Sequence, residues 1–165
     1  MFKKTAIVII VLAVAAFLYW TVSPLFVDKQ VEEKIEDLVS DGKMQEPSGL
    51  NQGQEKIDIV SAGQFTGLAN HEAQGTARII KVDEKYFIRF EEDFRSSNGP
   101  DVHVYLGRNG NYDPQTDLGL IKGNIGSQNY DIPGSINIGD YNEVWIWCRA
   151  FSVPFGKAEL KKEQT

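Results

Sequence analysis

The sequence predicts a mostly β protein, a small antiparallel β-sandwich or barrel, preceded by an N-terminal transmembrane helix and a short helical stalk. Three observations predict this fold class. Residues 5–27 carry no charge, apolar residues then recur at helical spacing, and glycines punctuate short β-rich runs from residue 57 onward. A chain of 165 residues fits one such domain with an appendage. About eight strands in the second part favour a sandwich or barrel.

The charge-free segment 5–27 is long enough to cross a bilayer. At about 1.5 Å per residue, a helix of this length spans the roughly 30 Å hydrocarbon core. Lys3 and Lys4 precede the segment, and Asp28 is the first charge after it. The positive-inside rule therefore places residues 1–4 in the cytoplasm and the rest of the chain outside the plasma membrane, with membrane lipid as a partner.

A cleaved signal peptide is the alternative interpretation of this segment. The small residues Ala13, Val14 and Ala15 resemble a cleavage site. However, the apolar run continues beyond them to Trp20, so cleavage would leave a hydrophobic new terminus. An uncleaved signal anchor is the favoured prediction.

A short amphipathic helix is expected after the anchor. Asp28 is positioned to cap it, and Asp41-Gly42 to end it. This helix is either a stalk or a surface helix packed on the domain, and its spacing fits both. Residues 40–56 are polar and rich in Gly and Gln, which is typical of a linker, so 28–56 is assigned as stalk and linker and 57–165 as the folded domain. The apolar residues at helical spacing are Val27, Val31, Ile35, Leu38 and Val39.

Period-two alternation supports several strands of the domain. Val102 and Val104, for example, share a face opposite His103. The predicted strands are Gln64–Leu68, Gly75–Val82, Lys85–Glu92, Asp101–Leu106, Asp117–Ile121, Ser127–Ile132, Glu143–Ala150 and Gly156–Leu160.

The single cysteine, Cys148, lies in the most aromatic predicted strand. One cysteine excludes an internal disulfide and a Cys-x-x-Cys pair. Alternation places Cys148 with Val144 and Ile146, and places Trp145 and Trp147 on the opposite face. Cys148 is therefore either a small core residue or a thiolate that exchanges electrons or binds a metal or haem iron.

The two histidines are the candidate partners of such a thiolate. His103 is the preferred auxiliary ligand, and His71, in a polar loop, is a weak one, because the two lack metal-binding spacing. The prosthetic group is unknown; haem and no group at all both stay open. Its pocket would be shaped by the neighbouring aromatic residues Trp147, Trp145 and Phe151.

Charge and motifs exclude several other classes. Residues 1–27 hold two of the 17 bases, Lys3 and Lys4, so the rest of the chain sets 15 bases against all 23 acids, and nucleic acid is not an expected partner. Hydrolase and transferase motifs are absent from the sequence, which leaves enzymatic activity open. Oxygen-bearing residues at alternate positions of 109–117 resemble a calcium loop, although a plain hairpin turn is favoured there.

Several segments taken together resemble the DM-thirteen domain, also called the electron-transfer DM domain, over about residues 57–160. The most specific is Trp147-Cys148-x-x-Phe151, followed by Phe155-Gly156. Others are Gly63-Gln-Phe65, His71-x-x-x-Gly75, Asn98-Gly-Pro-Asp101 and Gly126-x-Gln128-x-Tyr130.

The resemblance implies a β-rich extracytoplasmic module in which the cysteine matching Cys148 carries redox chemistry, as a bare thiol or by holding a group such as haem. Relatives join the domain to DOMON and cytochrome modules, which implies electron transfer with a redox partner. The leading hypothesis is therefore a membrane-anchored redox or electron-transfer module centred on Cys148. The alternative is a cell-surface binding or adhesion module with a buried structural cysteine.

Overall fold

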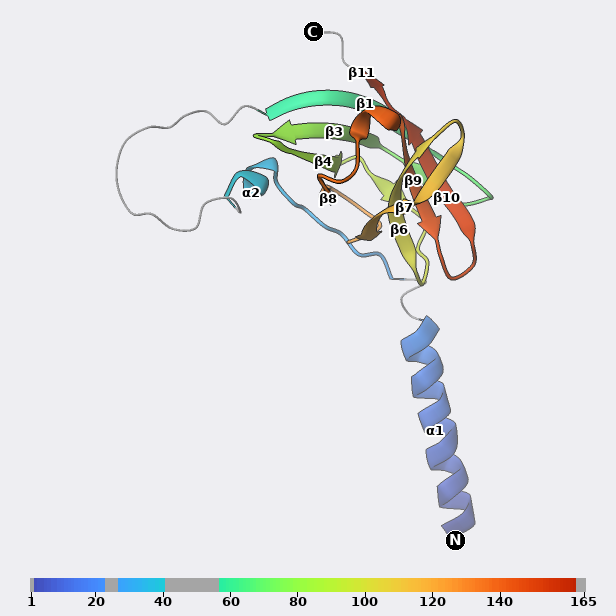
Figure 1. The fold of residues 1–165 in the computed structure, drawn as a ribbon. Coiled ribbons are helices and arrows are strands. Elements are labelled where there is room, and N and C mark those ends of the chain that lie inside the picture. The colour runs from blue at the N-terminus through green and yellow to red at the C-terminus, as the bar shows by residue number, and fades with distance from the viewer. Residues whose placement is uncertain (1, 23–26, 41–56, 163–165) are drawn as a thin grey trace, which may run out of the picture.

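The computed structural model describes residues 2–22, 27–40 and 57–162 (Figure 1). Helix α1 covers Phe2–Val22, and helix α2 covers Ile35–Ser40. The strands are β1 (Ile57–Gly67), β2 (Ala73–Gln74), β3 (Thr76–Val82), β4 (Lys85–Phe90), β5 (Arg95–Ser96), β6 (Val102–Arg108), β7 (Asn111–Leu120), β8 (Gln128–Ile132), β9 (Glu143–Cys148), β10 (Val153–Glu159) and β11 (Lys161–Lys162).

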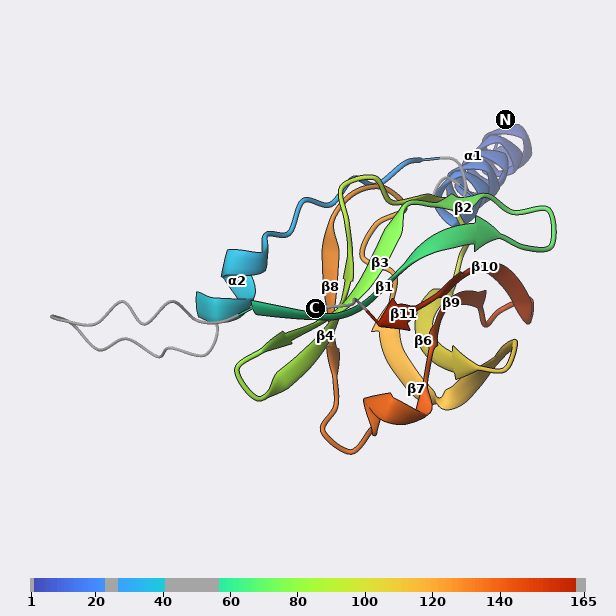
Figure 2. The same cartoon turned by 90° about the horizontal axis from the view of Figure 1, so that it is seen from above.

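The main sheet is antiparallel and curls into a nearly closed barrel. Its strand order is β7-β6-β9-β10-β1-β3-β4-β8, with β11 added to β1 and a separate β2–β5 pair. β1 joins the two halves, because Ile57–Gln64 pair with β3 whereas Phe65–Gly67 pair with β10. Figure 2 shows the strands curving around one interior. The mostly β class is confirmed, and of the two predicted architectures the barrel describes it better.

Alternating side chains fill the barrel interior. Phe65, Phe90 and Phe94 form edge-on and tilted ring contacts, with ring centroids 4.5–5.3 Å apart. Val104 and Ile146 pack in the same fully buried cluster. The core is therefore continuous, and the two faces of each strand have different environments.

The predicted strands agree with the structure, and their ends shift by more than two residues at three places. β1 begins seven residues before the predicted Gln64, β7 begins at Asn111 rather than Asp117, and β10 begins at Val153 rather than Gly156. At residues 109–110 the favoured hairpin turn is confirmed: Asn109 and Gly110 both have positive φ, as a tight turn between β6 and β7 requires.

The helix predicted directly after the anchor is wrong over residues 28–34. This segment, called the strap, is extended, and α2 starts only at Ile35. The Val31 and Glu33 backbone N–H groups donate to the Ile125 and Ser127 carbonyls at 2.9 Å, which draws them out of a helical pattern. Asp28 accepts from the Asn98 and Asn124 amides instead of capping a helix.

α2 packs on the domain, as the surface-helix alternative predicted. Its Leu38 contacts a small apolar cluster on the outside of β3 and β4, formed by Ile80, Val82 and Phe87. The predicted linker 40–56 falls, after its first residue, outside the described residues.

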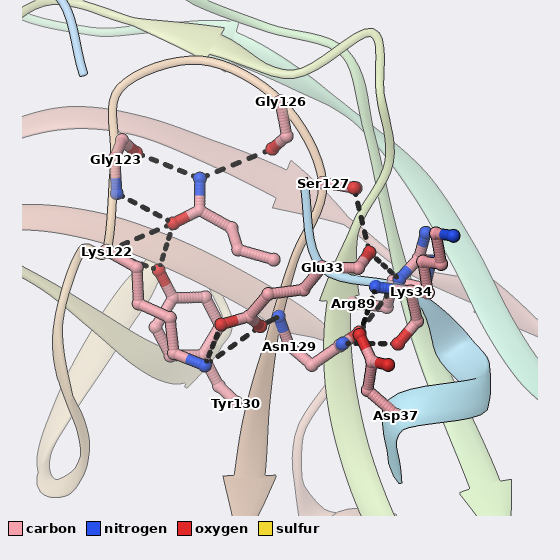
Figure 3. Close-up of polar contacts among 11 residues, drawn as sticks. Glu33, Lys34, Asp37, Arg89, Lys122, Gly123, Gly126, Ser127, Asn129 and Tyr130 are labelled. Carbon is pink, nitrogen blue, oxygen red and sulfur yellow. Dashed lines mark hydrogen bonds and ion pairs between the residues drawn. The ribbon is translucent and has the colours of Figure 1, made fainter. Parts of the chain in front are cut away.

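The strap is fixed by a polar network (Figure 3). The Glu33 carboxylate binds Lys122 Nζ at 2.7 and 2.9 Å and accepts from the Asn129 backbone N–H at 2.8 Å. The Glu33 carbonyl accepts from Arg89 and from Ser127 Oγ. These bonds join the strap to β4, β8 and the loop before β8.

Buried Gln128 orders that loop from inside. Its side-chain oxygen accepts from Tyr130 Oη at 2.6 Å and from the Lys122 and Gly123 backbone N–H groups, while its nitrogen donates to the Gly123 and Gly126 carbonyls. Every hydrogen-bonding atom of the amide is used, which stabilises a polar group inside the domain.

Among residues 2–22, 27–40 and 57–162, no helix is both long enough and apolar enough to cross a membrane. The structure therefore does not confirm the predicted anchor over 5–27.

Gly126 provides a test of the strap contact. A Cβ at Gly126 would lie 2.2 Å from the Val31 carbonyl oxygen, and its φ is +91°. Gly119 has a similar φ of +106° but open space around it. We expect Gly126→Ala to lower the free energy of unfolding by about 1–3 kcal/mol more than Gly119→Ala, because only the former displaces the strap. Urea unfolding measures both, and equal losses would show that the strap adds no stability.

Candidate functional site

The β6–β9 pair determines where the predicted site residues lie. Cys148 pairs with Val102, and Trp147 pairs with His103. Because neighbouring residues point to opposite faces of a strand, Cys148 projects into the barrel whereas Trp147 and His103 project outward. The structure therefore separates Cys148 from its predicted auxiliary ligand.

Cys148 is part of the core. Its exposed fraction is 0 %, and it belongs to the interior cluster with Val102, Val144 and Ile146. Cys148 does not line the pockets beside the strap, beside the loop 97–101, beside β4 and β8, or beside Phe151. These surroundings do not fit a haem, which would need an open cavity beside the sulfur.

His103 lies on the outer face between two carboxylates. Its Nδ1 is 2.7 Å from Asp117 Oδ1, and its Nε2 is 3.2 Å from Asp101 Oδ1. Only a doubly protonated ring donates to both carboxylates at the same time. Both ring nitrogens are engaged by carboxylates, so neither is left open toward a ligand.

Arg149 joins the same two carboxylates from the end of β9. It binds Asp101 through Nε and Nη2, both at 3.1 Å, and Asp117 through Nη1 at 3.2 Å. The bidentate hydrogen bond from Arg149 lowers the pKa of Asp101. Burial acts to raise the pKa of Asp117, but hydrogen bonds from His103 and the Gly119 N–H outweigh it, and this pKa is also lowered.

Three aromatic residues extend this ionic cluster across the outer face. Tyr105 donates to Asp117 Oδ2 at 3.2 Å, and its ring meets Tyr112 edge-on at 5.2 Å. Tyr112 stacks on Trp147 with centroids 4.1 Å apart. Burial, followed by the Asp117 charge, raises the pKa of Tyr105 to about 12. We call the ionic and aromatic set the outer face; it comprises Asp101, His103, Tyr105, Tyr112, Asp117, Trp147 and Arg149.

Trp145 lies farther along the same side of β9, in a separate polar setting. Its Nε1 donates to Glu143 Oε2 at 2.8 Å, and Lys157 lies over its ring at 5.6 Å. Gly107 on β6 leaves the room for this indole, since a Cβ there would lie 2.3 Å from Trp145 Nε1. Trp145 therefore borders the outer face rather than a cysteine pocket.

His71 and Phe151, the two remaining predicted residues, lie at one end of the barrel. His71 stacks on Phe155 with ring centroids 3.8 Å apart. Phe151, in the turn between β9 and β10, is 68 % exposed. Both line a shallow pocket of about 320 Å³. Within the described residues, no group of three His, Cys, Asp or Glu side chains is arranged so that it could hold a metal ion.

The predicted oxygen ligands of 109–117 have other partners. Asp113 accepts from the Gln115 N–H at 2.9 Å and from Tyr141 Oη at 2.9 Å. Asp117 points instead to His103 and Tyr105. The two carboxylates thus serve a turn and the outer face, respectively.

Sequence reasoning missed Asp101, Tyr105, Tyr112 and Asp117 as site residues. The alternation that placed His103 opposite the apolar face of its strand also placed Tyr105 there, two residues later, so this signal was available. Tyr112 and Asp117 enter the site only through the register of β7 on β6, in which Asp117 pairs with Tyr105.

A protein-family model described as Electron transfer DM13 matches residues 64–160. The matched region covers more than half of the chain and nearly all of the barrel. The chain therefore belongs to the electron transfer DM13 family, as its resemblance to the DM-thirteen domain predicted. No curated protein and no solved structure matches the chain.

The carboxylates of the outer face predict a defined pH dependence. Because the folded-state pKa of Asp101 is lowered, its contribution to stability is present above about pH 4 and lost as the pH falls through the folded pKa. We expect Arg149→Gln to be less stable than the wild type at neutral pH, with a difference that shrinks in acid. Urea unfolding across this pH range measures it, with Arg108→Gln as the control. A difference independent of pH would contradict the Arg149–Asp101 assignment.

The burial of Cys148 predicts that its thiol is protected. N-ethylmaleimide should leave the native protein unmodified and modify it after urea unfolding, as mass spectrometry would show. Phe151→Cys, which introduces a thiol at an exposed position, is the matched control and should react without urea. With added haemin, the wild type and Cys148→Ala should give the same visible spectrum. A Soret band that depends on Cys148 would contradict the core assignment.

Proposed function

We propose that this chain is an electron-transfer module that exchanges electrons with a one-electron carrier through its outer face. Membership of the electron transfer DM13 family supports a redox role. The observation that carries the choice of face is the unbroken contact from Trp147 through Tyr112 to Tyr105, whose hydroxyl donates to Asp117. Indole and phenol rings are the protein side chains, apart from thiols, that lose a single electron most readily.

The proposed step balances one electron and one proton. An external one-electron acceptor takes an electron from Tyr105, with Tyr112 and Trp147 as intermediates along the ring contacts. The Tyr105 O–H bond breaks, its proton moves to Asp117 Oδ2 along the existing hydrogen bond, and Tyr105 becomes a neutral phenoxyl radical. The acceptor is reduced by one electron, and the return of an electron and the proton restores the phenol.

The ionic part of the outer face supports this proton transfer. His103 and Arg149 hold the two oxygens of Asp117 in place, so the acceptor oxygen stays aligned with Tyr105. Burial acts against the charged carboxylate of Asp117, but its hydrogen bonds with His103 and the Gly119 N–H outweigh this and disfavour a proton there, which favours the return of the proton to Tyr105 when the electron comes back. His103 and Arg149 act here as positioning residues.

A redox role centred on Cys148, as predicted from the sequence, is the competing version of this function. It requires oxidants or partners to reach a side chain with no exposed surface. The thiol stays a testable redox group, whereas the outer face offers the partly exposed rings of Tyr112 and Trp147 as a route to the buried ring of Tyr105. The two versions predict different sensitive residues.

A binding module without redox activity is the second candidate function. Tyr, Trp and Arg are the residue types most often responsible for binding energy at protein interfaces. The outer face presents Tyr112, Trp147 and Arg149 together, and Arg149 is exposed. This candidate predicts a surface that binds a partner but gives no radical on oxidation.

Membrane anchoring through residues 5–27 is proposed with this function. The support is the charge-free run itself, which follows Lys3 and Lys4. In this arrangement the barrel lies outside the plasma membrane, and its electron carrier is another extracytoplasmic protein.

Photochemical oxidation tests the proposal. Ruthenium(III) tris-bipyridine, generated by a laser flash, is the oxidant, and transient absorption together with electron paramagnetic resonance detects the tyrosyl radical. We expect Tyr105→Phe to lose most of the signal. Asp117→Asn should slow radical formation, because the proton acceptor is weaker, and Trp147→Phe should slow electron transfer from Tyr105.

Tyr86→Phe is the matched control, since Tyr86 is a partly exposed tyrosine on β4, away from the outer face. It should retain the signal, as should Cys148→Ala. Loss of the signal in Cys148→Ala, with Tyr105→Phe unaffected, would establish the cysteine-centred version instead. Equal yields in Tyr105→Phe and Tyr86→Phe would reject the outer face as the redox site and favour the binding module.

A further inference from the structure

We propose that one end of the barrel, defined by Val27, Leu120 and Phe151 and called the apolar end, rests against the lipid bilayer at the boundary between headgroups and acyl chains. The inference rests on the proposed membrane anchor and adds to it a second, peripheral contact. It assigns lipid as the occupant of a surface that the redox proposal does not use.

The first observation is the exposure of large apolar side chains at this end. Phe151 is 68 % exposed, Val27 60 % and Leu120 58 %. Within the described side chains of residues 27–38 and 57–162, the only other large apolar ones in this exposed class are Ile57 and Ile59, at the start of β1. The three most exposed of these apolar side chains, Val27, Leu120 and Phe151, are thus on separate chain segments.

Pairing and pocket residues place these three segments together. Leu120 pairs with His103 at the start of β6, directly after the loop 97–101. Phe151 lines a pocket with Asn98, Gly99 and Pro100 of that loop, and Val27 lines a second pocket that also includes Asn98 and Gly99. The three residues therefore surround one loop, at one end of the barrel.

The second observation is the point at which the chain from α1 enters the domain. Asp28 accepts from the amides of Asn98 and Asn124, at 3.1 and 2.8 Å, so the strap begins at the apolar end. α1 ends at Val22. The six residue steps from Val22 to Asp28 reach at most about 20 Å. When α1 lies in a membrane, the apolar end is therefore the part of the barrel nearest to that membrane.

The strap fixes the point at which the chain from α1 joins the barrel. Backbone and side-chain bonds fix residues 28–34 along the loop before β8, and the Glu33 carboxylate locks their far end (Figure 3). The chain from α1 is thus attached to the barrel at Asp28, at the apolar end, rather than at a residue farther along the strap. The start of β1, with Ile57, lies on the side of the barrel away from α1 (Figure 1).

The chemistry of the apolar end suits a lipid boundary. Phe and Leu gain free energy on leaving water for the acyl region, and aromatic rings are favoured at the interface. Two acids close to this end are already compensated, Asp101 by Arg149 and Asp28 by two amides. Contact with lipid therefore does not require these carboxylates to lose their partners.

Site-specific fluorescence in vesicles tests this contact. The full chain with Phe151→Cys is labelled with the environment-sensitive fluorophore NBD, reconstituted into vesicles of phosphatidylcholine and phosphatidylglycerol, and compared with Ile57→Cys. The buried Cys148 leaves each variant with one reactive thiol, and unreactive wild-type protein checks this. We expect a blue shift at position 151 and quenching by lipids that carry a doxyl group near the headgroup, with neither effect at position 57.

Carbonate extraction of the same vesicles separates the anchor from the apolar end. Extraction-resistant protein whose label at position 151 is neither shifted nor quenched would overturn the lipid contact and leave the anchor standing. Protein released by carbonate would overturn the anchor and the lipid contact with it. A blue shift at position 151 in detergent-free solution without lipid, together with a dimer by size-exclusion chromatography, would replace lipid with a second copy of this chain.

Discussion

The two-residue repeat of the β6–β9 pair is the constraint on which the rest of the site depends. In a nearly closed barrel, one face of every strand is packed with side chains and the other faces outward. Cys148, Val102 and Val104 therefore lie inside, and no rotation of one side chain brings the thiol to His103. A one-residue shift of register would exchange the faces, and the Trp145 indole, which lies across Gly107, opposes such a shift.

Several residues that carry the family resemblance have structural explanations. Gly126 leaves room for the Val31 carbonyl of the strap. The Gln128 side chain forms hydrogen bonds with backbone groups of the loop before β8, and Tyr130 donates to Gln128. Gly99 lies against the Phe155 ring, where a Cβ would approach within 2.8 Å. Asp101 differs from these, because its carboxylate faces outward to His103 and Arg149. Asp101 and Trp147 are thus family-like residues that the structure directs to the outer face.

Strand positions were predictable because period-two alternation reports burial directly. Val102–Val104 and Val144–Ile146–Cys148 have interior faces in the structure, as their spacing indicated. The strap was not predictable in this way. Val27, Val31 and Ile35 fit a helical period, but the partners of the strap backbone, Ile125 and Ser127, lie more than 90 residues away in sequence. The prediction also missed the first part of β7, before Asp117. This part is polar, and it forms a strand only because it pairs with β6.

For the site, the sequence predicts only which residues of one strand point to the same face. Alternation along one strand shows that His103 and Tyr105 share a side, yet it does not show which residues of other strands come opposite them. Tyr112, Asp117 and Arg149 reach His103 or its partners through register, turn geometry and strand order. These are long-range properties, which a single sequence does not report. The redox hypothesis therefore centred on the single cysteine, which the composition does report.

The outer face and the apolar end share an edge, and this proximity connects the two proposals. Arg149 belongs to the outer face, and Phe151 follows two residues later in the turn. Leu120 pairs with His103 across β6 and β7. A barrel resting on lipid through Phe151 and Leu120 would hold His103, Asp101 and Arg149 near the membrane, whereas Tyr112, which pairs with Gly107 farther along β6, would lie farther from it. An electron carrier that is itself bound to the membrane would then meet the aromatic rings by lateral diffusion, in a restricted orientation, rather than by collision from solution.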